Sequence, residues 1–100
     1  MPRIGNLVVD GLTIIEDGIG AAGADYVQIY QPIDRLVLRD VTILRRNAGT
    51  PSGHLVTVPG EQGRVDQLVL NDVSASGFDR LVADGEKIGE VTAVNVVSRR

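Results

Sequence analysis

Four segments of the chain carry the same pattern of apolar and turn-forming residues and align with one another without gaps. They are 4–14 (IGNLVVDGLTI), 33–43 (IDRLVLRDVTI), 65–75 (VDQLVLNDVSA) and 88–98 (IGEVTAVNVVS). Apolar side chains occupy the first, fourth, sixth and ninth positions of every copy. A single copy is too short to bury its own apolar side, so the repetition favours a fold in which successive copies stack on one another.

The spacing inside each copy predicts β-strands. Leu36 and Leu38 are two residues apart, as are Val41 and Ile43, and a period of two is that of a strand. The step of three from Leu38 to Val41 predicts a bend, with two short strands joined there by a tight turn. Residues that tolerate left-handed backbone fill the eighth position: Gly11, Asp40, Asp72 and Asn95. Turn formers also fill the second position: Gly5, Asp34, Asp66 and Gly89.

A third, shorter strand is expected in each unit, shortly before the next copy begins. The candidates are 26–29, 55–58 and 80–83. The stretches 16–24, 44–53 and 76–79 vary between units and are rich in glycine, alanine, serine and asparagine, so they are expected to be loops.

Three short strands per unit, joined by tight polar turns, resemble the right-handed parallel β-helix of the pectate-lyase-like solenoid superfamily. The resemblance covers 4–98 and implies an all-β fold, a single segment over 1–100 with about three to four short coils. Like residues would then lie above like, with Leu36 between Leu7 and Leu68. A small antiparallel β-sandwich also has many short strands, but it does not account for the same residue types recurring at the same place in each unit.

Composition excludes several classes of protein. The net charge of −3 argues against a nucleic-acid binder, which needs a basic face. No cysteine is present, which excludes disulfides, thiolate metal sites and a cysteine nucleophile. No apolar run approaches the roughly 20 residues of a membrane span, and the first residues lack the apolar core of a signal peptide.

One outer face of the predicted coils carries a column of β-branched residues. If Leu36 and Leu38 point inward, Val37 points outward together with its equivalents Val8, Val69 and Thr92. Such a stripe predicts a lateral interface with another subunit or domain, although β-branched residues also simply suit strands. No amphipathic capping helix flanks the repeats, so we expect a fragment of a longer solenoid or a chain that buries its ends in an assembly.

Candidate catalytic groups are few. Asp40 and Asp72 would stack about 5 Å apart, where two carboxylates can bind calcium or share a proton. Their place in the turn ladder with Asn95 favours a structural role, and they are too few for a tight calcium site. His54 is the only histidine, and it is a candidate general base or a turn residue. Neither a metal site nor a cofactor is predicted.

Two groups of residues are candidates for glycan contact. Arg45 and Arg46 lie beside His54 and can hold a sugar carboxylate, sulfate or phosphate. The same register, however, places Glu16 beneath Arg45 and Asp17 beneath Arg46, which predicts ion pairs instead. Tyr26 and Tyr30 occupy alternate strand positions and would both face outward if Val27 and Ile29 face inward, as an aromatic platform or as ordinary edge packing.

The resemblance implies a function. Phage tailspikes and secreted polysaccharide-processing enzymes look like this, which implies a non-catalytic scaffold or assembly segment of an extracellular or virion-associated, carbohydrate-directed protein, with weak glycan contact. The expected partners are a polysaccharide and either further copies or flanking coils, with no nucleic acid and no membrane. The alternative is part of the catalytic domain of a polysaccharide lyase, glycoside hydrolase or epimerase, with Asp40, Asp72, Arg45 and His54 as candidates.

Overall fold

The protein is all-β, with its strands in two parallel sheets. The computed structural model describes residues 4–16, 25–45, 53–59, 61–78, 80–82 and 87–99. The strands are β1 (Ile4–Glu16), β2 (Asp25–Gln28), β3 (Pro32–Arg45), β4 (His54–Thr57), β5 (Arg64–Ser76) and β6 (Ile88–Arg99). The described residues form no helix that is long and apolar enough to cross a bilayer.

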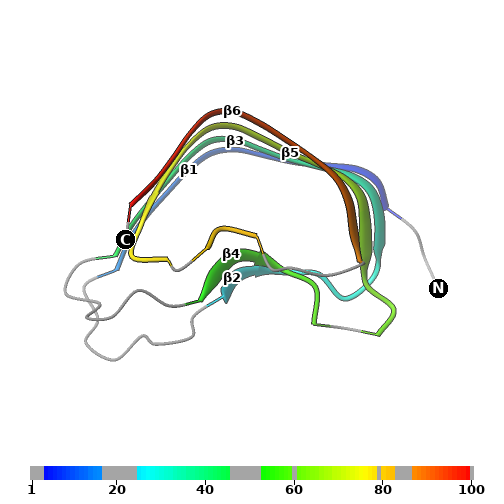
Figure 1. Ribbon diagram of the computed structural model, residues 1–100. Helices are drawn as coiled ribbons and strands as arrows, with labels where there is room; N and C mark the ends of the chain where they lie inside the picture. Colours follow the sequence, from blue (N-terminus) through cyan, green and yellow to red (C-terminus); the bar gives the residue numbers. More distant parts are fainter. Residues whose placement is uncertain are drawn as a thin grey trace.

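The two sheets face each other across the interior. One has four strands in the order β1-β3-β5-β6, and the other pairs β2 with β4. Every pairing between these strands is parallel. The four long strands lie one behind another along the same arc, and β2 and β4 lie opposite its concave side (Figure 1). The alternative of an antiparallel sandwich is therefore wrong.

The register of the four-stranded sheet is the one that the repeats predict. Ile33 pairs with Ile4 on one side and with Val65 on the other. Leu36 likewise lies between Leu7 and Leu68, so equivalent positions of successive copies form columns across the sheet. The predicted third strand is confirmed at β2 and β4, whereas 80–82 contributes only a single bridge, between Val82 and Val56.

The bend inside each repeat is also where the sequence places it, but its form differs from the prediction. Asp40, Asp72 and Asn95 have φ of 53°, 56° and 54°, and Gly11 has φ of 80°. Each of the four long strands nevertheless continues through this residue, so the prediction of two short strands joined by a tight turn is wrong. One left-handed residue is enough to shift the side-chain alternation while pairing resumes on both sides. The second-position residues such as Asp34 lie within strands, and none of them has a positive φ.

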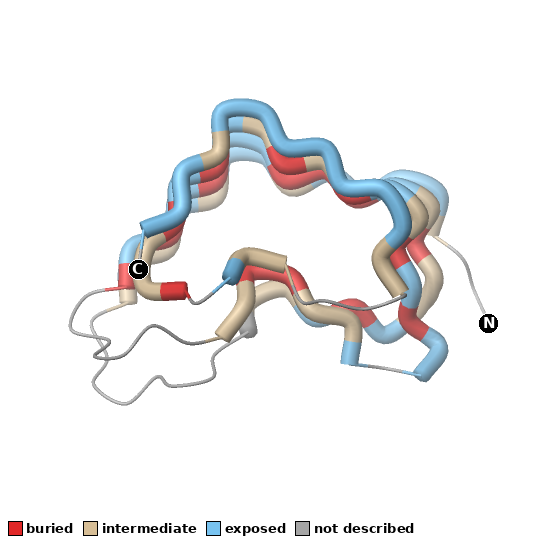
Figure 2. The backbone as a smooth tube through the Cα atoms, viewed as in Figure 1, coloured by how far each residue is buried: buried red, intermediate tan, exposed pale blue. Residues whose placement is uncertain are grey.

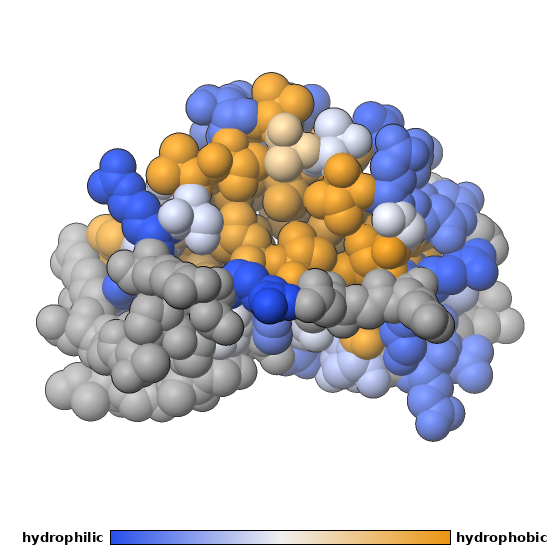
Figure 3. Space-filling view, in the orientation of Figure 1, coloured by the Kyte–Doolittle hydropathy of each residue, from blue (hydrophilic) through white to orange (hydrophobic). Residues whose placement is uncertain are grey.

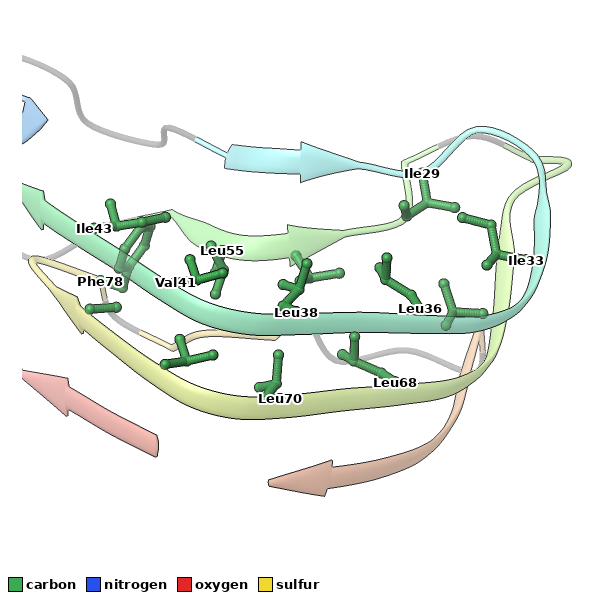
Figure 4. Close-up of a cluster of buried hydrophobic side chains, with 14 residues drawn as sticks. Ile29, Ile33, Leu36, Leu38, Val41, Ile43, Leu55, Leu68, Leu70 and Phe78 are labelled. Carbon is green, nitrogen blue, oxygen red and sulfur yellow. The ribbon is translucent and has the colours of Figure 1, made fainter. Parts of the chain in front are cut away.

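The core lies between the two sheets and is deepest at β3 and β5. Leu36, Leu38, Leu68 and Leu70 extend into it from the four-stranded sheet, and Leu55 meets them from β4 (Figure 4). The outermost strands β1 and β6 are mostly exposed or intermediate (Figure 2). Phe78, in a stretch expected to be a loop, is fully buried at the end of this core.

Candidate functional site

The candidate catalytic carboxylates of Asp40 and Asp72 lie on the outer side of the bend, where they belong to the column of turn residues at the eighth repeat position. Asp40 and Asp72 are both exposed. The side-chain amide of Asn95 donates a 2.7 Å hydrogen bond to Oδ1 of Asp72, linking β6 to β5 at this column. His54 opens β4 in the other sheet, so the structure does not gather these candidates into one site. Among the described residues no three histidine, cysteine, aspartate or glutamate side chains are grouped to hold a metal ion.

Arg45 does not present its charge to solvent. It is a buried charged residue at the end of β3, and its guanidinium lies over the Phe78 ring, 5.1 Å from the ring centroid. Its Nη1 donates a 2.7 Å hydrogen bond to the carbonyl oxygen of Gly77, and its backbone N–H donates to Ser76 Oγ at 3.3 Å. These contacts make Arg45 a structural link between β3 and the chain after β5, away from the surface where a glycan would touch. Arg46 and Asp17 fall outside the described residues.

Tyr26 points into the same corner. Its ring meets Phe78 edge to face, with centroids 5.3 Å apart, and its hydroxyl donates a hydrogen bond to the Glu16 carboxylate. Burial, this hydrogen bond and the negative charge of Glu16 raise the pKa of Tyr26 to about 12, against an opposing contribution from Arg45. The prediction that both tyrosines face outward is therefore wrong for Tyr26, whereas Tyr30 is exposed.

We call the side chains of Glu16, Tyr26, Arg45 and Phe78 the polar corner. Glu16 and Arg45 are register partners, as the repeat alignment predicts. The sequence gives no signal for Phe78 as their meeting point, because it follows the third repeat and has no equivalent in the others. The polar corner ties the ends of three strands to the core, and it has the chemistry of a structural cluster rather than of an exposed anion site.

The outer valine column is covered by its own members only at its centre. Val37 is only 8% exposed although it lies outside the core cluster. Its register partners Val8 and Val69 flank it about one strand spacing away on each side. Val8, which has a partner on one side only, is 50% exposed. The predicted interface stripe therefore presents apolar surface mainly at its β1 end.

An ion pair that the sequence analysis missed lies beside this column. Arg39 Nη2 is 2.9 Å from Asp10 Oδ2, and both side chains are half exposed. The signal was present, because the two residues occupy the same position in consecutive copies. An exposed pair of this kind contributes about 0 to 1 kcal/mol.

Apolar side chains at core positions are most exposed in β1 and β6, the two edge strands of the four-stranded sheet. Leu7 in β1 is 38% exposed and Val91 in β6 is 48% exposed, whereas Leu36 and Leu68 in the same column are 0% exposed. Figure 3 shows apolar side chains filling the hollow of the arc at the β6 end. At the β1 end lies an apolar pocket of about 240 Å³, lined by Ile4, Leu7, Ile29 and Ile33 and bordered by Gln28 and Tyr30. We call these two surfaces the β1 end and the β6 end.

Comparison with known proteins gives no relative. No protein-family model matches the chain, and neither curated proteins nor solved structures match it.

Proposed function

We propose that the chain is a non-catalytic segment of a right-handed parallel β-helix that works as a scaffold, with its two ends as assembly surfaces. Parallel pairing in the repeat register supports the β-helix, and the crossover rule for parallel strands supports the right hand. Asp40 and Asp72 share a turn column in the four-stranded sheet, and His54 lies in the other sheet, which favours a structural rather than a catalytic role. The extracellular or virion-associated, carbohydrate-directed setting follows from the resemblance of the repeat pattern.

One observation carries the scaffold proposal: residues at core positions are exposed where the stack stops. Leu7 and Val91 occupy the column whose inner members Leu36 and Leu68 are wholly buried. Free sheet edges with apolar positions beside them favour the addition of another strand. A further coil on either end would bury these side chains and satisfy the edge, and it can come from flanking coils of a longer chain or from another molecule.

Residue-resolved hydrogen exchange on a monomeric preparation tests this proposal. Backbone amides on the outer edges of β1 and β6 should exchange faster than those of β3 and β5, because no strand in the described part of the chain pairs with these edges. Equal protection of all four strands in a monomer would mean that the chain covers its own ends, and would overturn the scaffold proposal. Hydrolysis or cleavage of a polysaccharide that Asp40→Asn or Asp72→Asn abolishes would instead support the catalytic alternative.

A second candidate function, glycan contact, is favoured by the border of the pocket at the β1 end. Tyr30 is exposed there, and its hydroxyl donates a 2.7 Å hydrogen bond to Gln28 Oε1. An exposed ring beside side-chain amides is suited to stack on a sugar and to bond its hydroxyl groups. Titration with neutral and acidic oligosaccharides should show binding that Tyr30→Ala weakens, and Tyr26→Phe serves as the matched control because Tyr26 lies in the polar corner.

A further inference from the structure

We propose that the partner of these ends is a second copy of this chain, which continues the stack head to tail with its β1 beside β6 of the first. This inference rests on the proposed scaffold function and names its partner. Two features carry it, the register of the two edge strands and the apolar side chains that they expose, and the charges along the two edges do not oppose it.

The two free edges are geometrically equivalent to edges that already pair within the chain. β6 follows β5 in the repeat register, with Ile88 beside Val65, and β1 precedes β3 in that register, with Ile4 beside Ile33. A second copy whose β1 takes the next place after β6 would therefore set its Ile4 beside Ile88 of the first. All four strands point the same way, so the contact needs no change of direction.

The bends of the two edge strands also coincide. Asn95 in β6 has φ of 54° and Gly11 in β1 has φ of 80°, and both occupy the eighth position of their repeat. Within the chain this column joins neighbouring strands, since Asn95 donates to Asp72. In the head-to-tail stack Gly11 of the second copy would follow Asn95, and the two strands would turn at the same point.

The exposed apolar side chains match across this contact. In the repeat register Val91 of one copy lies beside Leu7 of the next, and these are the exposed members of an otherwise buried column. The pocket at the β1 end is lined by Ile4 and Leu7, so it opens where Ile88 and Val91 of the neighbouring copy would lie. Stacking would therefore extend the existing core through the contact.

Charges along the two edges do not oppose the contact. In the described parts of β6 and β1, Glu90 would face Asn6, Val94 would face Asp10, and Arg99 would face Ile15. No like charges meet at these positions. Because the two ends differ, the contact is heterologous, and its repetition gives open-ended stacks whose length rises with concentration.

Single-cysteine variants test the arrangement, because the natural chain has no cysteine. Val8→Cys and Thr92→Cys occupy the outer column, and both positions are exposed. Within one molecule they lie on opposite edges of the four-stranded sheet, three strand spacings or roughly 14 Å apart. A disulfide needs Cα atoms within about 7 Å, so only two molecules can form it.

Mixing the two single variants under mild oxidation should give a disulfide-linked heterodimer, with several-fold less product from either variant alone. The double variant should give a ladder of longer species. Val8→Cys mixed with Val97→Cys is the matched control, because Val97 is exposed on the same strand but five residues out of register. Retained β-sheet circular dichroism shows that each variant folds.

Three outcomes overturn the proposal. Val8→Cys cross-linking mainly with itself indicates pairing of two β1 edges, and equal yields in the matched and control mixtures indicate random encounters. No cross-link, together with a monomeric mass at all concentrations, excludes the second copy. In that last case fast exchange at β1 and β6 leaves the scaffold proposal standing with flanking coils as the cover, whereas equal protection of all four strands overturns both.

Discussion

The inner and outer strands of the four-stranded sheet carry the same repeat but are in different physical states. Leu36 and Leu68 are wholly buried, whereas Leu7 at the same position of the first copy is 38% exposed. The difference does not come from the residue, since all three are leucines. It comes from the number of neighbouring strands, because each repeat is completed only by the one on each side. The edge strands thus show that a repeat with a neighbouring strand on one side only leaves its core side chains partly exposed.

The largest expected effect is at the leucine column. Leu36→Ala should lower the free energy of unfolding by about 2 to 5 kcal/mol, because it removes a side chain packed on all sides and leaves a cavity. The matched Leu7→Ala should lower it by roughly 1 to 2 kcal/mol, since part of that side chain is already in water. Chemical denaturation of dilute protein measures both, and equal losses would mean that β1 is covered.

Glycine substitutions separate crowding from backbone strain. A Cβ at Gly77 would lie 2.9 Å from the Arg45 Cβ, and φ there is 85°, so Gly77→Ala should destabilise by about 2 to 3 kcal/mol. Gly11→Ala meets the same left-handed strain in open space at the edge strand, and should destabilise by about 1 kcal/mol. Thermal or urea unfolding compares them, and a neutral Gly77→Ala would contradict the placement of Arg45.

Two arginines offer a comparison between a buried and an exposed cation. Arg45→Met removes the hydrogen bond to Gly77 and the contact with Phe78, and should destabilise by about 1 to 3 kcal/mol. Arg39→Met removes only the exposed pair with Asp10, which is worth about 0 to 1 kcal/mol. Denaturation in low and high salt distinguishes them, because salt screens the exposed pair more strongly. A larger loss of stability from Arg39→Met than from Arg45→Met would contradict the structural role of the polar corner.

An effect visible only at high pH is expected from the polar corner. Folding raises the pKa of Tyr26 from 10.0 to about 12. The contribution of the protonated Tyr26 hydroxyl to the free energy of unfolding is therefore fully present below pH 10 and is lost as the pH rises toward 12. Tyrosinate absorbance of the folded protein should show an ionisation near pH 12 that Tyr26→Phe abolishes. Glu16→Gln should lower this pKa by removing a negative charge, and no change would show that Glu16 does not contact the hydroxyl.

The sequence predicts the part of the fold that repeats and misses the part that does not. The columns of equivalent side chains and the left-handed residue at the bend, such as Asp40, can both be predicted from recurring residue types, because stacking places equivalent residues side by side. The polar corner depends on Phe78 and Gly77, which have no counterparts in other repeats. Pattern alone also cannot tell that Val37 is sheltered by its two neighbours, since outward direction is not the same as exposure.

Long-range methyl contacts in solution test the stacking of equivalent residues most directly. Nuclear Overhauser effects should connect the Leu36 methyl groups with those of both Leu7 and Leu68, because the three are successive members of one column. The same measurement should give no close contact between Leu7 and Leu68, which lie two strand spacings apart. Leu36 without a contact to either leucine, or short Hα–Hα contacts typical of antiparallel pairs between β3 and its neighbours, would contradict the parallel stack.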